Sequence, residues 1–178
     1  MNSVFEQMRR NLVVRINQHN IKMEKVLIAL DYDPTAQKIA EAGYQLAKAM
    51  DAEVFLLHVI SDPVYYASRD YSPIMGFNGY MDLGSIQKDS PDGLKDASMH
   101  YLEKTRKHLG DDSIQILVKE GDFADAILKA AKEIHADMIV MGSHSQKWLE
   151  KIVMGSVTEK VLSHTNLPLF IVPTKKRK

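Results

Sequence analysis

Two glycines and a serine lie where one strand is expected to end and a helix to begin. The apolar run 138–141 stops at Gly142, and Gly155 and Ser156 directly precede a helical pattern that starts at Val157. Strand ends and helix starts leave main-chain N–H groups unpaired, and glycine lets a ligand approach the main chain closely. We therefore interpret this stretch as a candidate anion site, most often a phosphate site.

The same residues also have a purely structural interpretation. Gly142 can serve only to turn the chain after a strand, and Ser156 with Glu159 has the spacing of a helix capping box. The motifs G-x-x-x-x-G-K-[ST], G-x-G-x-x-G and G-x-S-x-G do not occur in the sequence. Motif evidence therefore argues against a P-loop NTPase, a standard dinucleotide dehydrogenase and an α/β-hydrolase.

A second group of polar residues follows the first two strand patterns. Asp33 is predicted to cap a helix that begins at Pro34, which leaves Asp31 without a capping role. A carboxylate at this position can accept hydrogen bonds from ribose hydroxyls, although it can also be only a turn-forming aspartate. Val59 can offer main-chain groups to a base, whereas His58 is interpreted as a packed strand histidine.

Cationic and metal-binding side chains give weaker signals. His144, Lys147 and Lys151 fall in the glycine loop and can reach phosphate, but lysines on loops are usually only solvated. The spacing of His58, His144 and Asp31 matches no metal motif, so we expect no metal site.

The elements that must position these residues alternate along the chain. We predict strands at 25–31, 52–60, 113–119, 138–141 and 169–172, and helices at 34–50, 94–109, 123–134 and 157–163. This alternation indicates an α/β fold with one doubly wound, mainly parallel five-stranded sheet and helices on both faces, which is Rossmann-like. We expect the first and fourth strands to be neighbours at the switch point, which would bring Asp31 close to Gly142.

Two segments stand apart from this pattern. Residues 1–22 are interpreted as an N-terminal extension, helical or flexible, before a domain that spans 23–178. The turn-rich, aromatic segment 61–91 leaves the carboxyl end of the second strand, where ligands bind in open parallel sheets. It is interpreted either as a lid over the site or as a surface insertion.

Composition narrows the classes of function. The chain has 178 residues, of which 45% are hydrophobic, and its 23 basic and 23 acidic residues give a formal net charge of +0. No basic excess points to nucleic acid or to an anionic membrane. Cysteine is absent, which excludes disulfides and thiolate metal sites. We expect one soluble, cytoplasmic domain without a nucleic-acid or membrane partner.

The chain resembles the universal stress protein family over about residues 25–173. In the nucleotide-binding branch of that family, the pattern is glycine, two residues, glycine, nine residues, glycine, then serine or threonine. Gly142, Gly155 and Ser156 match this pattern at the right separation, and Ser145 replaces the middle glycine. A serine hydroxyl can still donate to a phosphate oxygen, so the resemblance implies that binding is retained.

The resemblance implies an adenine nucleotide alpha hydrolase-like fold that binds ATP or AMP, with Mg²⁺ as an optional companion ion. Asp31 would hold the ribose, and Ala29 and Val59 would lie near the adenine. The residues around the ribose and phosphates would be Met141, Gly142, Ser145, Gly155, Ser156 and Val157. The family also pairs subunits through the last strand, which implies a homodimer formed along the strand from Leu169 to Val172.

Three functions stay open on the sequence. The first is a regulatory dimer that binds ATP or AMP in a stress response. The second is a slow ATP-hydrolysing enzyme, against which no general base with a partner and no carboxylate pair for Mg²⁺ stands near the loop, so we assign no catalytic residue. The third is a nucleotide-free interaction module in which the glycines are only structural.

Overall fold

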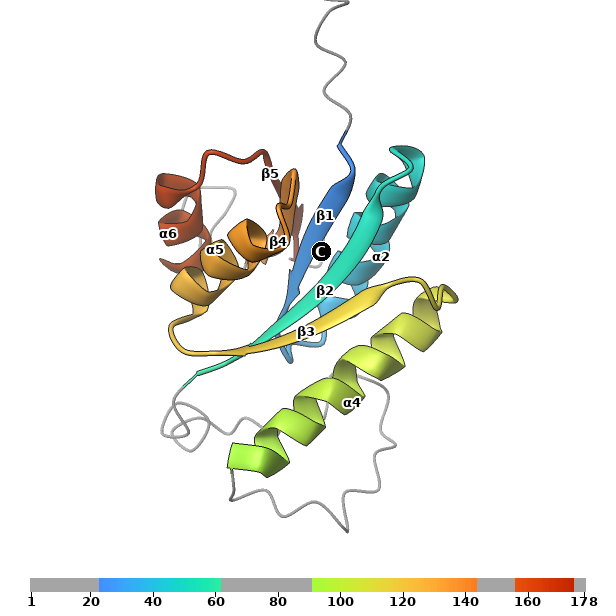
Figure 1. The fold of residues 1–178 in the computed structure, drawn as a ribbon, viewed down its shortest axis with the longest axis vertical. Helices are drawn as coiled ribbons and strands as arrows, with labels where there is room; N and C mark the ends of the chain where they lie inside the picture. The colour runs from blue at the N-terminus through green and yellow to red at the C-terminus, as the bar shows by residue number, and fades with distance from the viewer. Residues whose placement is uncertain (1–22, 62–90, 144–155, 175–178) are drawn as a thin grey trace, which may run out of the picture.

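The computed structural model describes residues 23–61, 91–143 and 156–174, in which strands and helices alternate. Residues 1–22, almost all of segment 61–91, Ser145 and Gly155 lie outside the described residues, as do the predictions made for them. The elements, shown in Figure 1, are β1 (Lys25–Leu30), α2 (Ala36–Ala49), β2 (Glu53–Ile60), α4 (Pro91–Leu109), β3 (Gln115–Glu120), α5 (Phe123–Glu133), β4 (Met138–Ser143), α6 (Ser156–His164) and β5 (Leu169–Pro173).

The five strands form one sheet in the order β3-β2-β1-β4-β5, and each neighbouring pair is parallel. The chain first builds the sheet outward from β1 to β3, and then crosses to the other side of β1 to add β4 and β5. The winding direction therefore reverses between β1 and β4, where Ile28 pairs with Val140. This confirms the predicted fold class and the predicted adjacency of the first and fourth strands.

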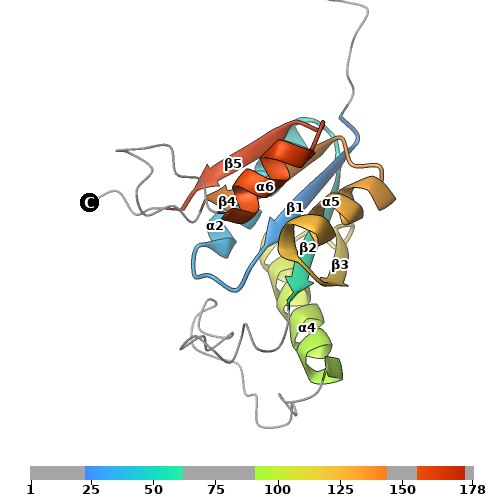
Figure 2. The ribbon, with the colours of Figure 1, turned by 90° about the vertical axis from the view of Figure 1, so that its left-hand side faces the viewer.

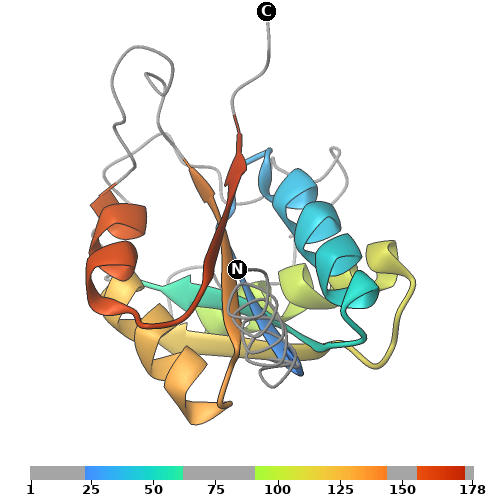
Figure 3. The same ribbon diagram turned by 90° about the horizontal axis from the view of Figure 1, so that it is seen from above.

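Helices cover both faces of the sheet. Helices α5 and α6 lie on one face (Figure 2), and α2 and α4 lie on the other, as the view along the sheet in Figure 3 shows. Ile28 and Leu56 belong to the core under α2 and α4, whereas Leu27 and Ile139 belong to the core under α5 and α6. The central strands are buried on both faces, which explains their nearly continuous apolar sequences.

Gly43 faces the central strands and leaves no room for a side chain between α2 and the sheet. A Cβ atom at this position would lie 2.8 Å from Cδ1 of Ile28 and 3.0 Å from Cγ1 of Val140. Both distances are shorter than ordinary packing allows, so a larger residue would push the helix away from β1 and β4. Gly43 thereby lets the middle of α2 pack against the two strands that flank the switch point.

The predicted start of α2 was wrong. Its N-cap is Thr35, which makes no side-chain capping bond. Asp33 instead closes a turn before the helix, because its Oδ1 accepts hydrogen bonds from the N–H and the hydroxyl of Thr35 at 2.8 and 2.6 Å. Aspartate forms such local turns readily, and here the turn competes with capping. The prediction for α5 was correct, since the Asp122 carboxylate caps it by accepting from two main-chain N–H groups.

Other boundaries differ from the predicted ones by a few residues. β4 continues through Gly142 to Ser143, because both residues still pair with β5. Helix α6 begins at Ser156 itself rather than after it, and α4 begins at Pro91. Among the described residues, no helix combines the length and the apolar character that crossing a membrane requires.

Candidate functional site

The carboxyl ends of β1 and β4 bring several predicted nucleotide-binding residues together. Asp31 directly follows β1, Gly142 is the second-to-last residue of β4, and these two strands are hydrogen-bonded neighbours. The start of α6 is held against the same end of the sheet, since the Thr158 hydroxyl donates to the Gly142 carbonyl at 3.2 Å. A strand end, a helix N-terminus and a carboxylate thus meet at the switch point, where open α/β sheets bind ligands.

Four further candidates contact one hydrophobic cluster on the face covered by α5 and α6. Val59 and Met141 belong to the buried part of this cluster, and Ala29 and Val157 pack against it. Val59 is only 4% exposed and Met141 only 5%, so these residues can meet a ligand through their main chain rather than through their side chains. The first residue of α6, Ser156, is exposed and can offer its hydroxyl.

Gly142 has a packing role that the sequence did not reveal. A Cβ atom built on it would overlap Cδ1 of Ile39 on α2 and would lie 3.1 Å from Cγ2 of Thr174. The missing side chain therefore makes room for α2 on one face of the sheet. The carbonyl of Gly142 accepts from Thr158 of α6, which covers the other face. Gly142 does not turn the chain, because β4 continues through it to Ser143; its structural role is close packing, which does not exclude a ligand beyond the strand end.

Asp31 takes part in the turn that leads from β1 into α2. Its Oδ1 accepts a hydrogen bond from the N–H of Asp33 at 3.2 Å, as a turn-forming aspartate does. Its carbonyl accepts from the hydroxyl of Tyr101 at 2.7 Å. The residue is half-buried. The turn and a ribose contact are compatible, because a carboxylate has two oxygens and about four lone-pair sites.

An aromatic cluster lies beneath Asp31 on the face covered by α2 and α4. The rings of Tyr32 and His58 have centroids 4.2 Å apart, and Tyr101 lies 5.0 Å from Tyr32 and 5.7 Å from His58. His58 is 2% exposed, which confirms its prediction as a packed strand histidine. Tyr101 was missed by sequence reasoning. The helical spacing of Ser98, Tyr101, Leu102 and Thr105 indicates an inward face of α4, but not the partner that the hydroxyl finds.

The protonation state of His58 follows from its contacts. Nδ1 lies 2.9 Å from the carbonyl of Leu30, which can only accept, so Nδ1 carries the proton. Nε2 is buried and has no hydrogen-bond partner among the residues that the structure describes. Burial lowers the pKa of His58 below its usual value, and this effect outweighs the opposing effects of the bond to Leu30 and of the nearby Asp31 charge. His58 is therefore neutral near pH 7.

The loop between β4 and α6 lies outside the described residues, and with it Ser145, Gly155, His144, Lys147 and Lys151. Within the described ranges, no three side chains of the metal-ligating types gather closely enough to hold an ion.

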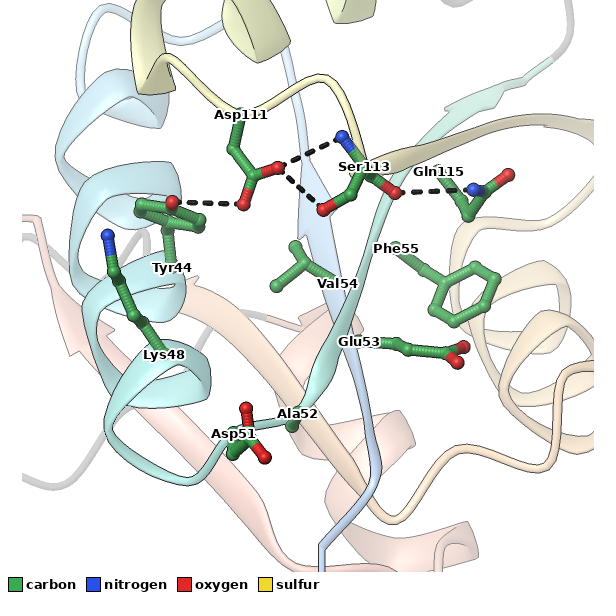
Figure 4. A pocket seen from close by; sticks show the side chains of 10 residues that line it. All are labelled: Tyr44, Lys48, Asp51, Ala52, Glu53, Val54, Phe55, Asp111, Ser113 and Gln115. Atoms are coloured by element: carbon green, nitrogen blue, oxygen red, sulfur yellow. Dashed lines mark hydrogen bonds between the residues drawn. The ribbon is translucent and has the colours of Figure 1, made fainter.

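A separate hollow of about 660 Å³ lies at the opposite, amino end of β2 and β3 (Figure 4). The Tyr44 hydroxyl donates to Oδ2 of Asp111 at 3.0 Å, and Oδ1 of Asp111 accepts from the N–H and hydroxyl of Ser113. Gln115 donates to the carbonyl of Ser113 at 3.2 Å, and none of the predicted nucleotide-binding residues lines the hollow. This hollow is therefore distinct from the candidate site.

Known proteins match the chain over most of its length. A family model described as the universal stress protein family matches residues 22–173. Universal stress protein MJ0577 of Methanocaldococcus jannaschii is 29% identical over 160 residues, which cover 88% of this chain and 98% of that protein. Stress response protein NhaX of Bacillus subtilis is 28% identical over 163 residues, which cover 84% of this chain and 97% of that protein.

Solved structures share the fold. The structure of hypothetical protein MJ0577 has a TM-score of 0.61 at 25% identity, and the match covers 88% of this chain and 99% of that one. A universal stress protein in complex with cAMP has a TM-score of 0.59 at 18% identity, covering 86% and 99% of the two chains. The residues matched by the family model include all five strands and both ends of the sheet. The chain belongs to the universal stress protein family.

Proposed function

We propose that the protein binds an adenine nucleotide, ATP or AMP, at the carboxyl end of β1 and β4 and acts in the stress response as a regulatory homodimer. The observation that carries the nucleotide proposal is the meeting of Asp31, the end of β4 and the N-terminus of α6 at the switch point of the sheet. A solved relative in complex with cAMP is consistent with this fold holding an adenine nucleotide.

Each part of the nucleotide has a chemically suited group in this arrangement. The Asp31 carboxylate can accept hydrogen bonds from ribose hydroxyls, and the main chain near Ala29 and Val59 can face the base. The first turn of α6 offers main-chain N–H groups and the positive end of the helix dipole to the phosphates. Gly142, Ser145, Gly155 and Ser156 would border the phosphates, and Mg²⁺ would accompany ATP through its phosphate oxygens rather than through a protein cage.

Isothermal titration with ATP tests the nucleotide proposal. The wild-type chain should show saturable binding. Asp31→Ala should weaken ATP binding by roughly tenfold or more, since a hydrogen bond to a charged group contributes about 1.5–3 kcal/mol. Asp111→Ala removes an aspartate at the other end of the sheet and should leave the affinity unchanged. Inorganic phosphate should bind Asp31→Ala as it binds the wild type, because the ribose contact is absent. No saturable heat with wild-type protein would discard the proposal.

The dimer proposal rests on the edge strand β5. Among the strands that the structure describes, β5 has a single neighbour, β4, and its Phe170 is 40% exposed. An exposed apolar edge strand tends to pair with another chain, so a second copy bound along 169–172 would cover it. Sedimentation should give a dimer for the wild type and a monomer for Phe170→Asp. Leu162→Asp alters a side chain on α6 that is 44% exposed and should remain dimeric. A dimer that survives Phe170→Asp but not Leu162→Asp would place the interface on α6.

A further inference from the structure

We propose that Tyr101 and His58 are positioning residues for nucleotide recognition, because together they fix the main chain on both sides of Asp31 and so aim its carboxylate at the ribose. This inference rests on the proposed function. Neither residue needs to touch the nucleotide, since both act on Asp31 through its backbone.

The two hydrogen bonds hold successive carbonyl groups. His58, on β2, donates from Nδ1 to the carbonyl of Leu30 at 2.9 Å, and Tyr101, on α4, donates its hydroxyl to the carbonyl of Asp31 at 2.7 Å. The first carbonyl belongs to the peptide before the Asp31 Cα atom, and the second belongs to the peptide after it. Peptide units are planar, so fixing both planes fixes the two backbone torsions of Asp31 and the direction of its Cα–Cβ bond.

The donors themselves are held rigidly. Tyr101 is 5% exposed and His58 is 2% exposed, so water does not readily replace either bond. The ring of Tyr32 lies against both of them. Its hydroxyl donates to Oγ of Ser98 at 2.9 Å, because the Ser98 hydroxyl already donates to the carbonyl of Leu94. Helix α4 therefore contacts the turn after β1 at two points, through Ser98 and Tyr101.

The direction of the Asp31 side chain matters because the residue has two tasks. One oxygen accepts the Asp33 N–H in the turn, so the carboxylate can also serve a ribose only if its orientation suits both partners. A carboxylate held in advance loses less entropy on binding than one that must be ordered by the ligand. Removing a backbone anchor should therefore reduce recognition of the ribose hydroxyls and leave recognition of the rest of the nucleotide nearly intact.

The test compares ATP with 2′,3′-dideoxy-ATP, which lacks both ribose hydroxyls, in titrations of the full chain. Tyr101→Phe removes one hydroxyl and keeps the ring. It should weaken ATP binding about 3- to 10-fold, which corresponds to the free energy of one hydrogen bond. It should weaken the binding of dideoxy-ATP less than about 2-fold. Tyr44→Phe is the matched control, because it deletes the same group at the other end of the sheet and should change neither affinity. The double variant Asp31→Ala with Tyr101→Phe should bind ATP as Asp31→Ala alone does.

Variants of His58 provide an independent test of the same proposal. His58→Asn keeps an N–H donor near the position of Nδ1, and it should bind ATP more tightly than His58→Leu, which keeps apolar volume but has no donor. Thermal unfolding of each variant shows that it is folded at the titration temperature. If Tyr101→Phe loses equal affinity for ATP and dideoxy-ATP, or loses no affinity for ATP, the positioning role is overturned. The proposed function still stands in that case, provided that the wild-type protein binds ATP. Wild-type protein that binds neither nucleotide would overturn both.

Discussion

The two ends of the parallel sheet use the same polar group in different ways. At the amino end, the hydroxyl of Tyr44 bonds a carboxylate, Asp111, that is already engaged in its own turn beside an open hollow. At the carboxyl end, the hydroxyl of Tyr101 bonds a main-chain carbonyl within a buried aromatic cluster. The first arrangement satisfies side chains with one another, whereas the second immobilises the backbone.

At the carboxyl end, side-chain donors hold main-chain carbonyls on both strands of the switch point. Leu30 and Asp31, after β1, have their carbonyls held by His58 and Tyr101. Gly142 and Ser143, at the end of β4, have theirs held by the hydroxyls of Thr158 and Thr174. Four carbonyls thus point toward protein donors instead of toward an incoming anion. The end of the sheet that is expected to bind a ligand is therefore the end whose main chain is fixed, whereas the hollow lined by Tyr44 and Asp111 lies at the other end.

The largest expected effect concerns Gly142→Ala at the carboxyl end. Its new Cβ atom would overlap Cδ1 of Ile39, so we expect the free energy of unfolding to fall by about 1–3 kcal/mol, as overpacking typically costs. Urea unfolding curves measure this loss.

Ile39→Val is the matched partner, since it removes the Cδ1 atom that the new methyl group would meet. The double variant should therefore lose less stability than the sum of the two single losses, which a double-mutant cycle detects. Gly142→Ala as stable as wild type would show that α2 yields easily, and that the glycine is not needed for packing.

The alternation of elements could be predicted because it follows from continuous apolar runs and helical spacing, and the adjacency of the first and fourth strands followed from the usual topology of doubly wound sheets. The start of α2 could not be predicted, because aspartate is equally suited to forming a local turn and to capping a helix. Only the geometry shows that its carboxylate bonds Thr35.

The candidate site was only partly predictable for a similar reason. Asp31 and Gly142 are marked by their positions at strand ends, and the predicted adjacency of β1 and β4 brings them to one edge. The contact of Tyr101 with Asp31 spans 70 residues of sequence and depends on how α4 crosses the sheet. The overlap that Gly142 avoids depends likewise on the height of α2 above the sheet, which no local pattern encodes.

An effect of intermediate size is expected from pH, again at the carboxyl end. Burial lowers the pKa of His58 in the folded protein, so the unfolded chain binds a proton more readily than the folded one. The contribution of His58 to the free energy of unfolding should therefore be fully present above the pKa of histidine in the unfolded chain, about 6.5. It should fall as the pH drops below that value, with a slope of at most about 1.4 kcal/mol per pH unit.

Urea titrations at several pH values, with His58→Asn beside the wild type, measure this contribution. The variant lacks the titrating group, so the part of the slope between pH 5 and 6.5 that belongs to His58 should vanish. A slope of equal size in both proteins would assign the pH dependence to other groups. The rings of Tyr32 and Tyr101 pack against His58, and the charge of Asp31 attracts a protonated His58, which makes the downward shift of its pKa smaller without reversing it.

The smallest effect is expected at the amino end, from Tyr44→Phe. This substitution deletes one hydrogen bond to a half-buried carboxylate that keeps its bonds to Ser113, so the loss of stability should stay below about 1 kcal/mol. The pKa of Asp111 lies below its usual value mainly because of the hydroxyl and N–H of Ser113, with a smaller effect from Tyr44. Side-chain NMR titration should therefore show the Asp111 pKa rising only slightly in Tyr44→Phe and more in Ser113→Ala. If Tyr44→Phe instead costs as much stability as Gly142→Ala, the amino end is anchored as firmly as the carboxyl end, and the contrast between them fails.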